Sequence, residues 1–290
     1  MKYRTLILSA IVVISLAVTA AVIITDPKQT SYLQDPYQIY IMEAGILKQN
    51  LPIRDGEDIS ITYSFNEPGF QNLLKKYNIE KTAGSGSSFH RAVRLMNEFA
   101  PRLTHKSDYD NHIEMRSLPL LEYSLDRKQN GINCLNKAQI LNEMCLALGI
   151  YSRKLWLMPY SQYDNDCHVV NEIWDEKLNK WIMLDITDNS YWVDKNGTPL
   201  SALEIRTKGA EQAFCTPVHP GQTLSDLQKV KQRNIASFLY IMKNMAYLEY
   251  KDSYGEGNIG KVYPLCPESM TLDCAPMSVS SVLCPPDQSF

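Results

Sequence analysis

The stretch from Gly131 to Gly149 constrains the fold most, because it reads as a turn followed by a buried helix. Its apolar residues recur at steps of three and four, which predicts one apolar helix face. These residues are Leu135, Ala138, Leu141, Cys145 and Leu148. Gly149 stands where a left-handed residue commonly ends a helix. We therefore expect Cys134 at or beside the first helical residue.

A cysteine at a helix start has a special electrostatic setting. The unpaired backbone N–H groups and the helix dipole favour an anion there, and the thiolate is the nucleophilic form of cysteine. A free cysteine more commonly serves as a small buried apolar residue. Cys134 is thus a candidate nucleophile whose interpretation depends on the residues that accompany it.

Two segments of strand composition follow the helix and are joined by a polar hairpin loop. If Trp174 pairs with Trp181, then His168 and Asp185 become diagonal neighbours on one face of the hairpin. Diagonal neighbours are about 7–8 Å apart, within reach of longer side chains. A register slip of one residue would place them on opposite faces. This register is an expectation that the fold can test.

Cys134, His168 and Asp185 together supply a nucleophile, a general base and a residue that orients the base. At this point the chain resembles the transglutaminase-like superfamily over about residues 88–205. The resemblance is carried by Gly131-Ile-Asn-Cys134, Ala147-Leu-Gly-Ile150, Arg153–Met158, His168–Trp174 and Trp181–Thr187. It implies an α+β, papain-like core with a nucleophile helix packed on an antiparallel sheet, and these three residues in those three roles.

One position departs from the pattern of several animal members, which have tryptophan directly after the catalytic cysteine. This chain has Leu135 there. The departure argues against calcium-dependent cross-linking of the animal type and leaves the three-residue pattern intact.

Acyl transfer also needs hydrogen-bond donors for the developing oxyanion. The backbone N–H of Cys134 is the natural first donor. The side chain of Gln129 or Asn133 is a candidate for the second, although amides in a turn more commonly face solvent.

The resemblance implies a thiol enzyme that acts on peptide or amide bonds through an acyl-thioester. Water as acceptor gives a peptidase or amidase, an amine gives acyl transfer, and the sequence leaves both open. The substrate is expected to be a protein or peptide, with no cofactor and no metal. A formal net charge of −3 and the lack of a recognisable motif argue against nucleic acid. The alternative is a non-catalytic extracytoplasmic binding or structural module that retains the fold.

The N-terminus reads as a membrane segment. Lys2 and Arg4 precede an uncharged run from Leu6 to Thr25, long enough to span a bilayer as a helix. The positive flank predicts an N-terminal transmembrane helix that acts as an uncleaved signal anchor, with the catalytic domain extracytoplasmic. The alternative is a cleaved signal peptide and a secreted domain.

The remaining organisation follows from composition. We expect a signal anchor at 1–25, a linker and N-terminal extension at 26–87, the catalytic core at 88–205, a C-terminal helical extension at 206–263 with a long helix around 224–250, and a tail at 264–290 rich in Pro and Cys without regular structure. In an oxidising compartment Cys215, Cys266, Cys274 and Cys284 are available for disulfides of undetermined pairing.

Overall fold

The computed structural model describes residues 8–18, 36–161, 163–222, 235–271 and 274–286. The chain divides into two compact units, residues 1–42 and 43–290. In the first unit, residues 8–18 form a helix with exposed apolar side chains. The second unit contains the sheet and the helices that pack on it, and all that follows concerns this unit.

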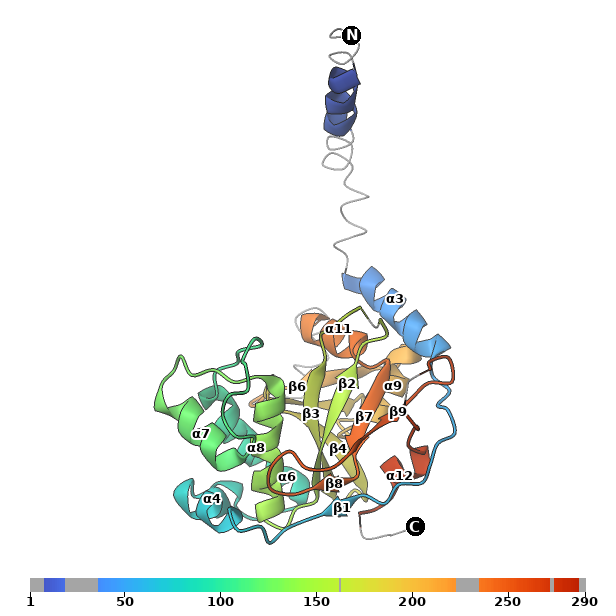
Figure 1. Ribbon diagram of the computed structural model, residues 1–290. Helices are drawn as coiled ribbons and strands as arrows, with labels where there is room; N and C mark the ends of the chain where they lie inside the picture. Colours follow the sequence, from blue (N-terminus) through green and yellow to red (C-terminus); the bar gives the residue numbers. More distant parts are fainter. Residues whose placement is uncertain (1–7, 19–35, 162, 223–234, 272–273, 287–290) are drawn as a thin grey trace. The chain divides into compact units, whose positions relative to one another are not determined.

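A seven-stranded antiparallel sheet forms the centre of the second unit, with the strand order β6-β5-β4-β3-β2-β7-β9 (Figure 1). Its strands are β2 (Ser152–Met158), β3 (His168–Asp175), β4 (Lys180–Asp185), β5 (Ser190–Asp194), β6 (Cys215–Val218), β7 (Tyr247–Lys251) and β9 (Val262–Leu265). A short parallel pair, β1 (Thr62–Tyr63) and β8 (Ser253–Tyr254), forms a separate small sheet.

The predicted hairpin register is confirmed. Trp174 pairs with Trp181, and the two indole rings contact each other edge to face. The other β3–β4 pairs have the same register. Ile173 lies on one face of the sheet and Val170 on the other. Because a strand alternates its side chains between two faces, this register decides which residues of β3 and β4 can meet.

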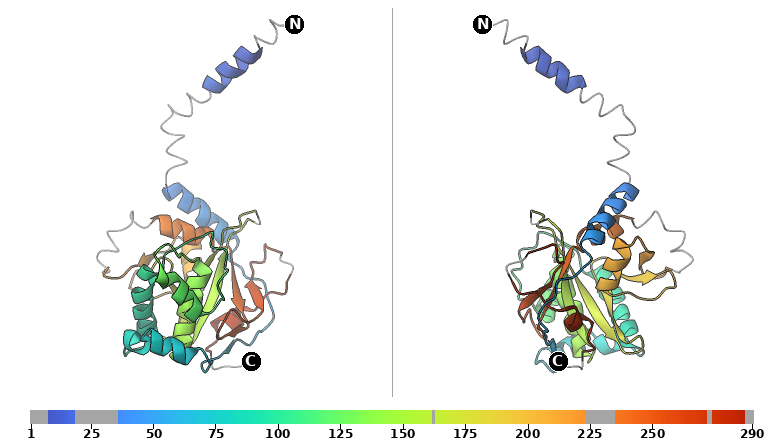
Figure 2. Two further views of the ribbon diagram at one scale, coloured as in Figure 1. Left: turned by 60° about the vertical axis from the view of Figure 1, so that its left-hand side comes forward. Right: turned by 90° about the vertical axis from the view of Figure 1, so that its right-hand side faces the viewer.

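Two hydrophobic cores lie on the two faces of the sheet. One contains Ile173 and Leu184 and is covered by helices from the first half of the unit: α4 (Phe70–Lys76), α5 (Ile79–Ala83), α6 (Ser88–Phe99), η1 (Ala100–Arg102), α7 (Ser117–Asp126) and α8 (Cys134–Ala147). These helices gather on one side of the sheet in all views (Figures 1 and 2).

The other core contains Val170 and Met183 and is covered mainly by later elements of the chain. They are α9 (Ala202–Ala210), α11 (Ile235–Lys243), α12 (Val279–Leu283) and the last turns of α3 (Pro36–Gln49), where Leu47 is buried. The first and last segments of the second unit thus complete one core together.

Helix α8 begins and ends where the sequence predicts. Asn133 and Asn136 form a reciprocal capping box at its start, and Gly149 follows its end with a φ of +72°. The expectation of a single apolar face is wrong, because every residue from Asn136 to Leu146 is buried. The helix is enclosed on all sides, and polar side chains such as Gln139 and Glu143 pair with each other inside the fold rather than with water.

The N-terminal membrane helix is not supported by the structure. Part of the predicted run from Leu6 to Thr25 lies outside the described residues, and no helix among the described residues is long and apolar enough to cross a bilayer.

The C-terminal half differs from the expected helical extension and irregular tail. Within 206–263 the chain adds the strands β6 and β7 to the sheet, and β9 follows at its edge. The long helix expected around 224–250 is shortened to α11, with residues 223–234 outside the description. The tail contains α12, whose Val282 is buried in the second core. These short elements gain their stability from packing on the sheet, which a local sequence pattern does not show.

Candidate active site

The three candidate catalytic residues come from three adjacent elements. Cys134 is the first residue of α8, His168 is the first of β3, and Asp185 is the last of β4. Because β3 and β4 are antiparallel, the beginning of one and the end of the other lie at the same end of the sheet. His168 and Asp185 are joined there by a hydrogen bond of 2.7 Å between Nε2 and Oδ2.

The position of Cys134 is set by two groups of hydrogen bonds. At the helix start, the Asn133 side chain accepts from the backbone N–H of Asn136, and the Asn136 side chain accepts from the N–H of Asn133. Further along, the Asn171 amide of β3 donates to the carbonyl of Ala138 at 2.9 Å. The cap fixes where α8 begins, and the second bond ties the helix to the strand that carries His168.

The imidazole of His168 is buried and strongly favours its protonated form. Burial alone would lower the pKa of His168, but the charge and hydrogen bond of Asp185, together with the nearby Cys134 thiol, outweigh burial and raise it to about 10. His168 therefore holds a proton at neutral pH. A protonated imidazole beside a thiol favours the thiolate.

The carboxylate of Asp185 is held in its charged form by the hydrogen-bond donors around it. Its burial would raise the pKa of Asp185, but the charge and hydrogen bond of His168 and the backbone N–H groups of Thr187 and Asp188 bring it below the usual range. One oxygen thus faces His168 and the other accepts both backbone bonds. These bonds hold the carboxylate toward the imidazole.

The hydrogen-bond pattern assigns a task to each ring nitrogen of His168. Nε2 is bonded to Asp185, so Nδ1 is the nitrogen left for the thiol of Cys134. Cys134 is partly exposed, whereas the His168 and Asp185 side chains are buried. The thiol can therefore meet a substrate while its two partners are shielded from water.

The two candidate oxyanion donors have different surroundings. The Asn133 amide caps α8 and also donates to the side chain of Asn111 at 3.2 Å. Gln129 is exposed in the turn before the helix. The backbone N–H of Cys134 is in the first turn of α8, where N–H groups have no partner within the helix.

Two residues near the site were not singled out by sequence reasoning. The Tyr240 ring of α11 contacts the His168 ring edge to face, with centroids 5.4 Å apart, and its hydroxyl donates to Asp166. Lys137 is buried one helical turn after Cys134. Neither has a local signal in the sequence, since tyrosine and lysine at helical spacing fit an ordinary amphipathic helix.

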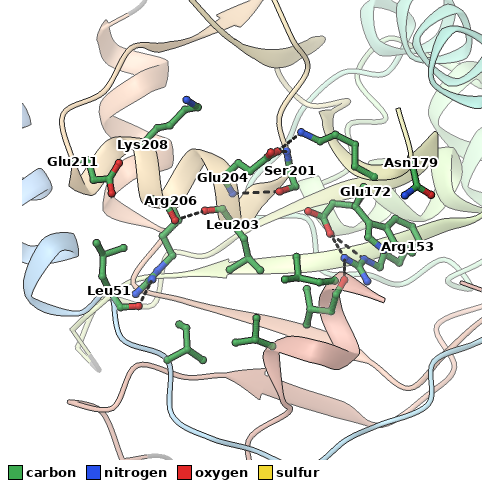
Figure 3. Close-up of a pocket in the computed structure, with 17 residues that line it drawn as sticks. Leu51, Arg153, Glu172, Asn179, Ser201, Leu203, Glu204, Arg206, Lys208 and Glu211 are labelled. Atoms are coloured by element: carbon green, nitrogen blue, oxygen red, sulfur yellow. Dashed lines mark hydrogen bonds and ion pairs between the residues drawn. The ribbon is translucent and has the colours of Figure 1, made fainter. Parts of the chain in front are cut away.

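A cavity of about 650 Å³ lies on the second core's face, away from the three residues (Figure 3). Several of its charged groups are already paired: Arg153 with Glu172, Lys180 with Glu204, and Arg206 with backbone carbonyls. Lys208 and Glu211 also line it. Among the described residues, no group of three or more His, Cys, Asp or Glu side chains is arranged to hold a metal ion. The part of the chain that the structure describes contains no disulfide, and Cys134 is a free thiol.

A family model matches the part of the chain that contains the three residues. The model of the transglutaminase-like superfamily matches residues 75–186. Among solved structures, a candidate cysteine protease from Cytophaga hutchinsonii is similar, with 14% identity and a TM-score of 0.31. The similarity covers 51% of this chain and 48% of that one, so this chain spans about half the length of that protein. Curated proteins gave no match. Residues 75–186, which contain all three residues of the site, therefore form a domain of the transglutaminase-like superfamily.

Proposed function

We propose that this protein is a thiol enzyme that cleaves or transfers acyl groups at peptide or amide bonds, with Cys134, His168 and Asp185 as its catalytic residues. The observation that carries the proposal is the hydrogen bond of 2.7 Å between His168 Nε2 and the Asp185 carboxylate, with Cys134 near enough for its thiol to act on the same imidazole. This arrangement brings together a nucleophile, a base and an orienting carboxylate.

The first half of the reaction follows from these contacts. The Cys134 sulfur, whose proton is held by His168, forms a bond to the carbonyl carbon of the substrate, and the π electron pair of the carbonyl moves to its oxygen. The tetrahedral intermediate then collapses: the carbonyl double bond forms again, the C–N bond breaks, and the proton of His168 passes to the leaving amine. The product of this half is an acyl-thioester on Cys134.

The second half reverses the proton transfer. His168, now neutral, accepts a proton from water or from an amine as that acceptor attacks the thioester. The C–S bond breaks and the thiolate returns beside the protonated imidazole. Water completes hydrolysis, and an amine completes transfer; the three residues serve both outcomes equally.

We further propose that the domain acts outside the cytoplasm and is held at the membrane by its N-terminus. The proposal is supported by Lys2 and Arg4, which precede a run of 20 uncharged residues from Leu6 to Thr25. A protein or peptide substrate suits the superfamily and this placement.

The test is to incubate the full-length protein with a mixture of glutamine- and asparagine-containing peptides in ¹⁸O-water, with and without a fluorescent primary amine. New peptide termini or side-chain carboxylates that carry ¹⁸O indicate hydrolysis, and peptides that carry the amine indicate transfer. Both should be absent in Cys134→Ala and nearly absent in His168→Ala. Equal product from the wild type and Cys134→Ala would refute the proposal.

A further inference from the structure

Lys137 is a buried lysine beside the proposed nucleophile. It follows Cys134 by three residues on α8 and is 2% exposed. Residues three apart lie on the same helix face, and helical side chains lean toward the N-terminus. The Lys137 side chain therefore runs back toward the turn that carries Cys134.

Every other buried lysine or arginine among the described residues has a partner. Arg153, Lys154, Arg206 and Lys251 each donate to carboxylate, amide or backbone carbonyl oxygens. By contrast, the Lys137 ammonium has no hydrogen bond or ion pair with any residue that the structure describes. The side chain is 2% exposed and Nζ keeps only a small contact with solvent, so the ammonium has lost hydration and gained no hydrogen bond in return, which costs free energy. The fold alone gives no reason to keep it there.

The charges that act on Lys137 are those of the site. Burial lowers the pKa of Lys137, and Asp185 and Cys134 offset part of that effect. Asp185 is already hydrogen-bonded to His168 and to two backbone N–H groups, so it does not pair directly with Lys137. The Lys137 ammonium therefore remains available to a negative charge that arises only during the reaction.

We propose that Lys137 supplies the positive charge that stabilises the tetrahedral oxyanion formed when Cys134 attacks an acyl carbon; this inference rests on the proposed function. Attack by the Cys134 sulfur places a negative charge on the former carbonyl oxygen. A cation already held near that position by a largely buried side chain stabilises the oxyanion with little reorganisation at the moment of reaction. The backbone N–H of Cys134 would donate to the same oxygen.

The test compares two reagents that need the same thiolate but differ in the oxyanion. Iodoacetamide is attacked at a saturated carbon, iodide leaves, and no oxyanion forms. The ester p-nitrophenyl acetate is attacked at a carbonyl carbon, so a tetrahedral oxyanion must form before p-nitrophenolate leaves. Both rates are measured at Cys134 of the full-length protein by mass-spectrometric mapping.

Lys137→Met keeps the approximate length of the side chain and removes its charge. The ratio of the acylation rate to the alkylation rate at Cys134 should fall by a factor on the order of 100, the cost of losing one oxyanion-stabilising group. The matched control is Lys154→Met, which removes another buried lysine whose partners are Gln139 and Asn258. That variant should be less stable to heat but should keep the wild-type ratio.

Stability gives a second readout that a purely structural lysine would not produce. Because the methionine side chain would not bury an unpaired charge, the melting temperature of Lys137→Met should equal or exceed that of the wild type. An unchanged rate ratio, or a melting temperature that falls as in Lys154→Met, overturns the inference. If instead the wild type shows no acylation at Cys134, the proposed function itself fails.

Discussion

Replacing Asp185 with Asn tests how the structure keeps a proton on His168. The difference between 6.5, the ordinary pKa of histidine, and about 10 corresponds to about 5 kcal/mol in favour of the protonated ring. Asp185 is the main source of this preference, whereas burial opposes it. In Asp185→Asn the carboxylate charge is gone. Burial, which lowers the pKa of His168, and the nearby Cys134 thiol remain, so this pKa should fall to about 6.5 or below.

The hydrogen bonds add a second effect. In the wild type one oxygen of Asp185 accepts from the backbone N–H groups of Thr187 and Asp188. If the asparagine oxygen keeps those bonds, its NH₂ group faces Nε2 of His168, which must then accept. The ring proton moves to Nδ1, where the ring can no longer take a proton from Cys134. Turnover at neutral pH should therefore fall by about 10⁴-fold, as when the orienting residue of such a triad is neutralised.

The assay is an NMR titration of the five histidine rings from about pH 5 to about pH 11, with His168→Ala used to assign the His168 signal. In the wild type, His168 should titrate last, near 10. Because its pKa is raised on folding, its contribution to stability is complete below about 6.5 and is lost as the pH rises through about 10. The difference in melting temperature between the wild type and Asp185→Asn should shrink over that interval. A His168 that still titrates near 10 in Asp185→Asn would refute this reasoning.

Three further predictions concern other parts of the molecule. Cys134→Ala should abolish turnover while its circular dichroism spectrum stays that of the wild type. The control Cys274→Ala, at an exposed cysteine, should leave turnover unchanged. Turnover in Cys134→Ala would exclude Cys134 as the nucleophile. Asn133→Ala removes the cap of α8 and should lower the free energy of unfolding by about 1 kcal/mol in denaturant titrations. An unchanged free energy of unfolding would show that the cap does not stabilise the helix. In cells the protein should stay with membranes through carbonate washes and be digested by external protease, whereas a soluble form that begins near Ala21 would favour a cleaved signal.

The parts of the fold that sequence reasoning predicted depend on local signals. The start of α8 is marked by residues at its cap, and its end by Gly149, which has a positive φ. The pairing of Trp174 with Trp181, assumed from two strand-like segments joined by a polar loop, places His168 and Asp185 on a shared face. Local signals gave the helix start that carries Cys134 and the hairpin that carries His168 and Asp185, whereas the packing of α8 on β3 joins distant segments.

Other features depend on packing between distant segments, and local patterns did not show them. The outer strands β6, β7 and β9 are four or five residues long and exist because they extend a sheet already formed by earlier strands. The contact of Tyr240 with His168 joins residues far apart in the sequence. The buried setting of Lys137 could not be read from α8 alone, since its enclosure on all sides comes from neighbours across the fold.

Cys134 should form a covalent acyl intermediate with the help of His168. The most direct measurement is rapid quenching of the full-length protein with p-nitrophenyl acetate at neutral pH, followed by digestion and mass spectrometry of the peptides that contain its seven cysteines. One acetyl group should accumulate on the peptide that contains Cys134 within the first turnover, and His168→Ala should form it far more slowly. Acetylation spread evenly over the accessible cysteines, or a Cys134 adduct that forms equally fast without His168, would contradict this prediction.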